Sequence, residues 1–361
     1  MGRIGPIGLI LRPLYSTPFT LHLVKVSSMK AAFFEATGTP DVLQFGELPT
    51  PEPKAGEIRV KVLAATVNPI DTYVRSGLAA MGGPFPFVTG RDFAGIVDAV
   101  GPSVSRFKPV DRVWGANQGS GGRTGSCAEF CLTGEGFAYP IPANVPDEQA
   151  AACALVGITA HLGLFQCGKL KPGEWVYVSG GTGGVGTMVI QMAKVAGANV
   201  ATTVGSEEKA AMARSLGADA VINYKTDDVP ARLKEAAGGA GFNVWYETQP
   251  PGDLDKTIEL MAPRGRIVVM AGRTAKPSFT NGPFYVKGLS MHGFAMFNFT
   301  AAEQQHCAEE MNQWLSAGKL KALVGRRFDL KDVATAHRLQ EENTLKKAGT
   351  LTGKIVLAPG A

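Results

Sequence analysis

The chain lacks the cysteine and histidine patterns that mark disulfide frameworks and metal centres. Five cysteines are spread over 361 residues, and none of them forms a Cys-x-x-Cys pair. An odd number of scattered cysteines indicates free thiols in a reducing compartment. The five histidines are scattered too, and they form no group with the spacing of metal ligands. We therefore expect neither a disulfide-rich secreted domain nor a metal site built on histidine.

Long apolar segments and blocks of one charge are also missing. The longest apolar stretch, residues 150–165, contains His161 and is shorter than the roughly 20 residues that a membrane-spanning helix needs. The net charge of +5 is small for this length, and no cluster of Lys and Arg interleaved with aromatic residues marks a nucleic-acid groove. With 45% hydrophobic residues, the chain can form two globular domains. We expect a soluble protein with no membrane span and no nucleic-acid partner.

Acidic residues are absent from the start of the chain. Three basic side chains are the only charges before Met29, and the first acid is Glu35. An acid-free leader that contains arginine is typical of a mitochondrial transit peptide, although no small-residue cleavage site follows a compact apolar core. An upstream start or a disordered extension is the other interpretation, since Met29 opens the first clear strand. We expect residues 1–28 to be a leader or a disordered extension, and the protein to be cytoplasmic, or mitochondrial if this segment is a transit peptide.

A glycine loop between a strand and a helix is the most informative motif that is present. Residues 175–178 favour a strand, the spacing Gly181-x-Gly183-x-x-Gly186 follows, and apolar positions at helical spacing continue to Gly197. A bare match is weak in a chain with 45 glycines, but its place between strand and helix indicates a dinucleotide site. Glycines let the backbone approach a pyrophosphate, and the helix N-terminus offers N–H groups. The expected cofactor contacts are Gly181, Thr182, Gly183, Gly184, Val185 and Gly186.

Strands and helices alternate after this loop. The apolar or β-rich runs lie at residues 199–204, 220–222, 242–246 and 266–270. Alternation of this kind predicts an α/β domain with a parallel, doubly wound sheet. We assign this nucleotide-binding domain to residues 155–297.

The end of the second of these strands lacks an acidic residue, which favours NADPH. A carboxylate there would accept the ribose hydroxyls of NAD. This chain has Ser206 instead, followed by Lys209 and, after the third strand, Tyr224. A hydroxyl, an ammonium group and a phenol are donors suited to a 2′-phosphate, which a carboxylate would repel. The alternative is that Lys209 is a solvated helix residue beside Glu207 and Glu208.

Short β-rich runs broken by glycine and proline flank the nucleotide-binding domain. They lie at residues 30–34, 57–65, 93–100, 111–114 and 354–357. Short strands at this spacing predict a small β-barrel. The expected organisation is a barrel domain over residues 29–154, to which residues 298–361 return after the nucleotide-binding domain, with a cleft between the two domains.

Four motifs in this order carry a family resemblance. They are VNPIDTYVRSG at 67–77, GRDFAG at 90–95, the glycine loop, and GKIV at 353–356. With them, the chain from Met29 onward resembles a medium-chain dehydrogenase/reductase of the zinc-independent quinone oxidoreductase, or zeta-crystallin-like, branch. The resemblance implies a catalytic domain built on a GroES-like β-barrel, a Rossmann domain, NADPH in the cleft, and commonly a homodimer formed through the edges of the Rossmann sheets.

The barrel motifs argue against a metal. Zinc-dependent relatives have a Cys and a Gly-His-Glu motif in this domain, whereas this chain has Arg91 and Asp92 after the glycine. Arginine does not give up its proton and cannot ligate zinc. Cys127 and Cys131 lack the second pair that a structural zinc site needs. We expect a metal-free enzyme.

Catalysis would then depend on the coenzyme and on donors to the oxygen that becomes negative. The resemblance implies that Asn68 and Tyr73 lie on the cleft wall beside the nicotinamide, and both side chains are donors. It also implies that Thr159 lies near the nicotinamide and the phosphates. Each has a structural alternative, in turn chemistry for Asn68 and in packing for the other two. Arg91 could stabilise an enolate, but we expect it to pair with Asp92.

Three departures from the relatives limit the assignment. No second tyrosine follows the Arg-Ser-Gly at residues 75–77, residues 246–251 differ from the usual Asp and Gly pair, and residues 345–350 are an insertion. The expected function is an NADPH-dependent oxidoreductase that transfers hydride to quinones or small α,β-unsaturated carbonyls without a metal. The alternatives are a 2-enoyl-thioester reductase, which the missing tyrosine disfavours, and a non-enzymatic NADPH-binding scaffold or regulatory protein.

Overall fold

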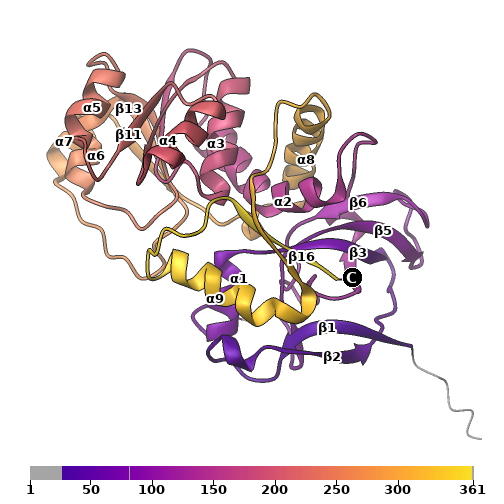
Figure 1. The fold of residues 1–361 in the computed structure, drawn as a ribbon. Helices are drawn as coiled ribbons and strands as arrows, with labels where there is room; N and C mark the ends of the chain where they lie inside the picture. Colours follow the sequence, from indigo (N-terminus) through magenta and orange to yellow (C-terminus); the bar gives the residue numbers. More distant parts are fainter. Residues whose placement is uncertain (1–26, 81, 360–361) are drawn as a thin grey trace, which may run out of the picture.

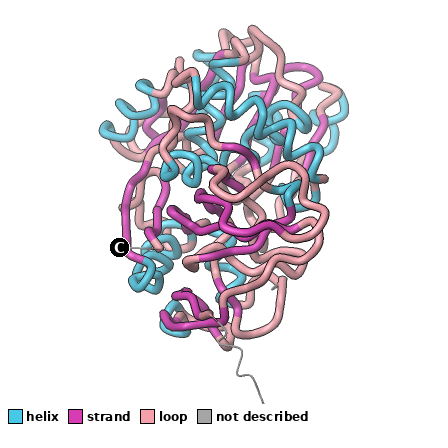
Figure 2. Tube along the Cα trace, turned by 90° about the vertical axis from the view of Figure 1, so that its right-hand side faces the viewer, coloured by secondary structure: helices cyan, strands magenta, loops and turns pink. Residues whose placement is uncertain are grey.

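The computed structural model describes residues 27–80 and 82–359, so the expected leader lies almost entirely outside the described residues. Within them, the strands form three sheets (Figure 1). Most helices gather in one half of the molecule, and the antiparallel strands lie in the other half (Figure 2). Each half therefore corresponds to one kind of sheet.

A six-stranded sheet forms the nucleotide-binding half. Its strand order is β11-β10-β9-β12-β13-β14, and all neighbouring strands are parallel. The strands are β9 (Trp175–Val178), β10 (Asn199–Val204), β11 (Ala220–Asn223), β12 (Phe242–Glu247), β13 (Met261–Val269) and β14 (Ser290–Gly293). The helices are α3 (Gly184–Val195), α4 (Glu207–Ser215), α5 (Val229–Ala236), α6 (Leu254–Leu260) and α7 (Asn281–Val286).

This sheet confirms the predicted doubly wound architecture. The strand order runs in one direction from β9 through β10 and in the other from β9 to β12. Ligands of such folds bind outside the carboxyl ends of the strands where the order reverses. The glycine loop follows β9, so the chain folds it to that position.

The strands of the other half pair antiparallel, except that β15 and β16 are parallel. A seven-stranded sheet has the order β15-β16-β3-β5-β6-β8, with β7 also paired to β3, and a second sheet has the order β2-β1-β4. The strands are β1 (Ser28–Phe34), β2 (Gln44–Pro49), β3 (Glu57–Val67), β4 (Phe87–Val88), β5 (Asp92–Val100), β6 (Arg112–Gly115), β7 (Phe130–Gly134), β8 (Tyr139–Pro140), β15 (Val324–Asp329) and β16 (Lys354–Ala358). Because β16 pairs with β3, the last described strand returns to the sheet that β3 and β5 form before the nucleotide-binding half.

Four helices accompany these strands. They are α1 (Pro69–Ser76), α2 (Asp147–His161), α8 (Ala301–Ser316) and α9 (Val333–Thr344). Short 3₁₀ turns occur at Pro40–Val42, Glu135–Phe137, Met296–Asn298 and Leu330–Asp332.

Helix α2 connects the two halves and is apolar on every side. It continues without a break into a π-helix, Leu162–Cys167, so the helical segment is longer than the apolar stretch suggests. The segment 147–167 is long and apolar enough to cross a membrane, but 89% of that window is buried inside the fold. A helix that is hydrophobic all round and enclosed by protein is a core helix.

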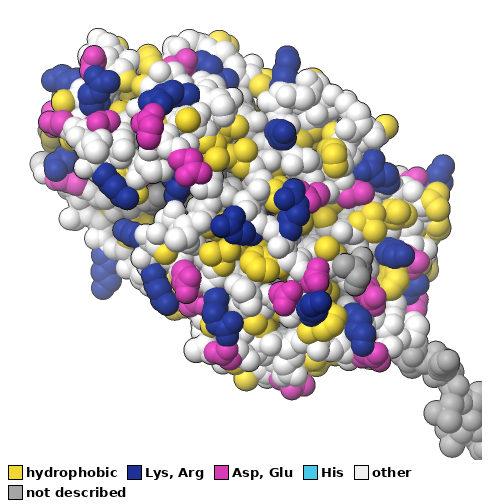
Figure 3. All heavy atoms as spheres, in the orientation of Figure 1, with side chains coloured by type: hydrophobic (Ala, Val, Ile, Leu, Met, Phe, Trp, Pro, Cys, Tyr) yellow, Lys and Arg dark blue, Asp and Glu magenta, His cyan; other side chains and the backbone are white. Residues whose placement is uncertain are grey.

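The structure has the free cysteines and the mixed surface charges that the composition predicts. All five cysteines are free thiols, and four of them are buried. Side chains of both signs are interspersed over the face shown in Figure 3. That face presents no extended field of one sign.

Candidate active site

The glycine loop is built so tightly that side chains do not fit at two of its positions. A Cβ atom at Gly181 would lie 2.2 Å from the hydroxyl of Thr202, and one at Gly186 would lie 2.3 Å from the carbonyl oxygen of Gly180. The loop therefore packs directly against β10 and against its own start. Gly183 is exposed and is the N-cap of α3. These glycines are the reason that the backbone remains uncovered where α3 begins.

The first turn of α3 offers free donors. Among the described residues, the N–H groups of Gly184, Val185 and Gly186 donate to no acceptor, and no side chain caps the helix. Unpaired N–H groups at the positive end of a helix dipole form an anion site. Buried Thr182 packs behind the loop, and its carbonyl oxygen accepts from the N–H of Gly353 at 3.2 Å. The unpaired N–H groups and the absence of side chains at this turn fit a pyrophosphate, and the expected coenzyme contacts of residues 181–186 stay a prediction.

The three side chains expected at a 2′-phosphate lie near the end of β10. Ser206 is the N-cap of α4 and accepts from the backbone N–H of Lys209 at 3.3 Å. Tyr224 is 57% exposed, and its hydroxyl lies against Gly205, where a Cβ atom would be only 2.3 Å away. The ammonium of Lys209 donates to the carbonyl oxygen of Gly349 at 3.0 Å, which ties the 345–350 insertion to this place.

The neighbouring carboxylate of Glu207 is engaged elsewhere, because Arg214 donates to it at 2.7 Å. A hydroxyl, an ammonium group and a phenol therefore lie near the carboxyl end of β10. This donor set fits a phosphate better than it fits a bare ribose diol.

Thr159 is buried in α2. Its carbonyl oxygen accepts from the hydroxyl of Tyr246 at 2.8 Å, which joins α2 to β12. The absence of a side chain at Gly163 makes this contact possible, since a Cβ atom there would lie 2.2 Å from that same hydroxyl. Thr159 thus connects the core helix to the sheet, and its expected coenzyme contact stays a prediction.

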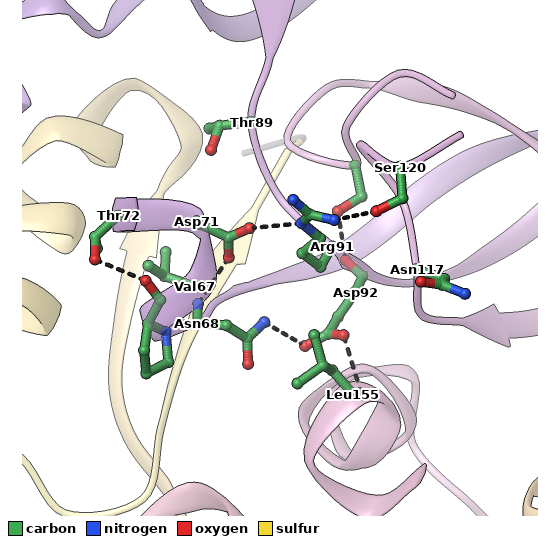
Figure 4. Close-up of polar contacts among 12 residues, drawn as sticks. Val67, Asn68, Asp71, Thr72, Thr89, Arg91, Asp92, Asn117, Ser120 and Leu155 are labelled. Carbon is green, nitrogen blue, oxygen red and sulfur yellow. Dashed lines mark hydrogen bonds and ion pairs between the residues drawn. The ribbon is translucent and has the colours of Figure 1, made fainter. Parts of the chain in front are cut away.

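Asn68 belongs to a buried polar network at the N-terminus of α1 (Figure 4). Its side chain is fully buried, and its Nδ2 donates to Oδ2 of Asp92 at 2.9 Å. Its Oδ1 accepts from the ammonium group of Lys354. Asp92 also accepts from the backbone N–H of Leu155 on α2 at 3.0 Å. Since both polar atoms of the amide are engaged, Asn68 holds α1 against β5 and β16 and offers no free donor.

Tyr73 lies on the half-buried face of α1, and unlike Asn68 it has a side-chain donor that is not engaged. Among the described residues, its hydroxyl has no hydrogen-bond partner. Burial raises the pKa of Tyr73 above its ordinary value, while the positive charge of Arg273 works in the opposite direction. Arg273 follows β13, so the electrostatic influence comes from the nucleotide-binding half. Tyr73 is thus a protonated donor on the side of α1 that faces that half.

Arg91 pairs with a different carboxylate from the one expected. Its Nε lies 3.6 Å from Oδ1 of Asp71, and its Nη1 donates to the hydroxyl of Ser120 (Figure 4). The expected pair with Asp92 is wrong, because Arg91 lies in the bend before β5, whereas the carboxylate of Asp92, the first residue of that strand, accepts from the side chain of Asn68 and the N–H of Leu155. The guanidinium also lies 5.5 Å from the ring centre of Phe297, which follows the last strand of the parallel sheet. Arg91 is therefore a fixed cation at the junction of the two halves.

The buried charges perturb one another. Burial raises the pKa of Asp71 to about 6, although the positive charge of Arg91 and the N–H of Asn68 lower it. Burial also lowers the pKa of Lys354, and the nearby carboxylate of Asp92 opposes that effect. The sequence motifs alone do not indicate a role for Lys354. The signal that could have found it is a lysine at the start of an apolar strand, where it is almost never buried without a partner.

The barrel does not offer a zinc site. Among residues 27–80 and 82–359, no group of three or more His, Cys, Asp or Glu side chains is arranged to hold a metal. Cys127 and Cys131 are fully buried, which raises the pKa values of both thiols, and no further ligand side chains complete a tetrahedral set beside them in the described residues. At the motif where zinc-dependent relatives have Gly-His-Glu, this chain has Arg91, which is paired with Asp71. The residues present do not fit a catalytic or structural zinc ion.

Comparison with protein families gives two matches along the chain. Residues 54–189 match the family described as alcohol dehydrogenase GroES-like domain, and residues 184–317 match the family described as zinc-binding dehydrogenase. These matches cover both halves of the fold and agree with a GroES-like domain joined to a Rossmann-type domain. The second description mentions zinc, which the side chains of this chain do not support.

Similarity to individual proteins indicates which branch of the family the chain belongs to. The chain is 33% identical over 324 residues to a quinone oxidoreductase of Rattus norvegicus, covering 89% of this chain and 94% of that protein. Among solved structures, it is similar to an Escherichia coli quinone oxidoreductase complexed with NADPH, with a TM-score of 0.81, 30% identity and coverage of 91% and 100%. It is also similar to an NAD-dependent alcohol dehydrogenase, with a TM-score of 0.82, 31% identity and coverage of 92% and 100%. The chain belongs to the medium-chain dehydrogenase/reductase superfamily, in its quinone oxidoreductase branch.

Proposed function

We propose that this protein is an NADPH-dependent oxidoreductase that transfers hydride to quinones or small α,β-unsaturated carbonyls. The observation that carries the proposal is the combination of open N–H groups at the start of α3 with Ser206, Lys209 and Tyr224 at the end of β10. Relatives named quinone oxidoreductase, at 33% identity over most of the chain, support the acceptor class.

The coenzyme assignment rests on charge. NADPH differs from NADH by the 2′-phosphate, and Lys209 supplies a positive charge where an NAD-specific site has a carboxylate. Structural relatives described as complexed with NADPH support this choice, while one is described as NAD-dependent. We therefore propose a preference for NADPH that depends on the ammonium group of Lys209 and the hydroxyls of Ser206 and Tyr224.

The coenzyme supplies a hydride from its nicotinamide ring, and the residues of this chain govern where the resulting negative charge forms. Tyr73 is the donor that we assign to the acceptor oxygen, because its hydroxyl is free and protonated. Asn68 is a positioning residue in this proposal, since it fixes the N-terminus of α1 through Asp92 and Lys354. The proton that completes the reduction comes from water. A hydrogen-bond donor held in place before the reaction lowers the barrier without reorganisation.

We also propose that the reaction needs no metal. The support is the donor set of the barrel, in which Arg91 is a cation already paired with Asp71 and the nearby thiols lack the further ligand side chains of a tetrahedral set in the described residues. Positive charge near the acceptor then comes from arginine and not from a Lewis acid.

We further propose a homodimer formed through the free edge of β14. This strand pairs only with β13 among the described residues. The preceding helix, α7, exposes Tyr285 and Val286 by 66% and 74%. An unpaired sheet edge next to exposed apolar side chains is a surface that another copy can cover. We propose a cytoplasmic location, in keeping with free buried thiols.

A panel of acceptors tests the function. Purified protein is mixed with NADPH or NADH and with a benzoquinone, a naphthoquinone, a small enone and crotonyl-CoA, and coenzyme oxidation is followed by absorbance. We expect turnover with NADPH on quinones or enones and little on crotonyl-CoA. Binding of NADPH without oxidation by any acceptor would favour the scaffold alternative and contradict the proposal.

A further inference from the structure

A second cavity lies away from the coenzyme residues. It has a volume of about 600 Å³, is open to solvent on one side, and is lined by the π-helix that continues α2, the C-terminal end of α3, and α8. Helices α3 and α8 both stand against α2 in Figure 1. The glycine loop is at the other end of α3, which has 12 residues. At a rise of about 1.5 Å per residue, the two ends are about 18 Å apart. The cavity is therefore separate from the proposed active site.

Aromatic rings form one wall of this cavity. The rings of His161 and Trp314 are stacked, with centres 5.8 Å apart and an angle of 26° between planes. Phe165 lies edge-on to His161 at 4.7 Å and tilted against Trp314 at 6.1 Å. Three rings in contact present π faces and edges to whatever fills the space. Faces of aromatic rings attract cations because their quadrupole is negative there.

A carboxylate lies on the same wall. Oε2 of Glu310 is 2.5 Å from Nε2 of His161, and the Glu310 side chain is 39% exposed. Among the described residues, the other carboxylate oxygen has no partner. Burial lowers the pKa of His161, and this effect outweighs the carboxylate that raises it. His161 is thus a neutral donor at neutral pH, so the negative charge of Glu310 is not cancelled.

The C-terminal end of α3 adds to the negative electrostatic potential of the cavity. Val195 is the last residue of α3 and Ala196 is its C-cap, and both line the cavity. The C-terminal end of a helix carries a partial negative charge. Lys194, in the same turn, is engaged by Asp219 at 2.8 Å. Carboxylate, helix end and ring faces all favour a positive ligand.

One polar atom in the wall is unsatisfied. Nδ1 of His161 is buried and has no hydrogen-bond partner among the described residues. Buried polar atoms are nearly always paired, so an orphan in a cavity wall is a feature that needs an explanation. A π-helix adjoins it, and short π segments occur frequently at functional sites. Neither feature follows from binding a coenzyme at the glycine loop, which is at the other end of α3.

We propose that this cavity binds a small organic cation with an aromatic or aliphatic body, such as a substituted ammonium ion. The ammonium group lies against Glu310 and the ring face of Trp314, and the apolar body fills the space toward Phe165. Anions such as nucleotides and acyl-CoA esters are excluded by the carboxylate. Metal ions are disfavoured as well, since no group of metal-ligating side chains occurs in residues 27–80 and 82–359.

Isothermal titration calorimetry with benzyltrimethylammonium tests the proposal on the full-length protein saturated with NADPH. We expect saturable 1:1 binding with a Kd of about 1 mM or tighter, the range for a ligand of this size. Glu310→Gln keeps the shape and the hydrogen bond to His161 but removes the charge, and we expect it to weaken binding at least about fivefold. Benzyl alcohol and benzenesulfonate, which lack the positive charge, should not bind.

Glu309→Gln is the matched control, because Glu309 precedes Glu310 on α8 and contacts Gln305 instead of the cavity. It should leave the affinity for benzyltrimethylammonium unchanged. The proposal is overturned if the cation does not bind, if Glu310→Gln binds it as tightly as the wild type, or if benzyl alcohol binds equally well. Displacement of the cation by NADPH would also overturn it, because the ligand would then occupy the coenzyme cleft.

Discussion

Replacing Tyr73 with phenylalanine separates the role of its hydroxyl from that of its ring. The hydroxyl is free of partners among the described residues, so its removal breaks no hydrogen bond of the folded protein. The ring stays in place on the half-buried face of α1. We therefore expect Tyr73→Phe to fold like the wild type and to differ only in turnover.

The size of the effect follows from the kind of donor that is lost. One neutral hydrogen bond to a developing oxyanion in a partly buried site contributes about 1.5 to 3 kcal/mol, or about 10- to 150-fold in kcat. Because burial raises the pKa of Tyr73, the donor keeps its proton through neutral and mildly alkaline pH. The kcat of the wild type should then be independent of pH in that range. Quinones, which are already electrophilic, should show a smaller loss than enones.

The assay is steady-state oxidation of NADPH with one quinone and one enone, accompanied by a fluorescence titration of coenzyme binding. The affinity for NADPH should change little, because the hydroxyl acts on the acceptor. Tyr285→Phe is the matched control, since that tyrosine is exposed on α7 and far along the chain from α1. If Tyr73→Phe reduces both acceptors at the wild-type rate, the assignment of this donor is refuted.

Three further outcomes test other parts of the account. Lys209→Glu should weaken NADPH binding by about 1.5 to 3 kcal/mol and leave NADH nearly unaffected, measured by coenzyme titration; equal weakening of both would mean that Lys209 supports the fold. Asp71 has a pKa raised to about 6, so the folded state holds its proton more tightly than the unfolded state, and the stabilisation present below about pH 4 is lost as the pH rises through 6. Asp71→Asn should remove about 2 to 3 kcal/mol of that pH dependence in denaturant unfolding, and an unchanged pH profile would contradict the raised pKa. Val286→Asp should convert a dimer into monomers in light scattering while activity per folded chain is retained. If the variant stays as dimeric as the wild type, this edge is not the interface.

Local chemistry made the glycine loop and the helix after it predictable. The glycine spacing and the helical periodicity that follows lie within about 20 residues, and the structure has α3 ending within two residues of the position expected from Gly197. Ser206 and Tyr224 come after neighbouring parallel strands, whose carboxyl ends meet at one edge of a sheet. Their proximity is a consequence of topology alone.

The polar network around Asn68 could not be predicted in the same way. Asn68 and Lys354 are 286 residues apart, and they meet because β16 pairs with β3. Nothing local in either segment indicates that pairing. The predicted pair of Arg91 with Asp92 fails for a different reason. Arg91 follows Gly90, which has a left-handed φ of 96°, and lies in a bend, so its neighbour in the sequence does not decide which carboxylate its side chain reaches.

The apolar stretch in α2 shows a further limit of sequence reasoning. Hydrophobicity marks residues 150–165 as buried, but it does not reveal that the helix starts earlier at Asp147 and continues as a π-helix to Cys167. Within this segment Gly163 leaves room for the hydroxyl of Tyr246, a residue 83 positions further along the chain. The cavity beside it was therefore invisible in the sequence.

The measurement that bears most directly on the central claim is NADPH oxidation by protein stripped of metal. After prolonged dialysis against a chelator, with zinc and other transition metals shown by mass spectrometry to be below stoichiometric amounts, the protein is assayed with a quinone. The account predicts turnover equal to that of untreated protein, because the donors are side chains of the cleft and the barrel offers no zinc ligands. Loss of activity on chelation that returns only when zinc is added would contradict it.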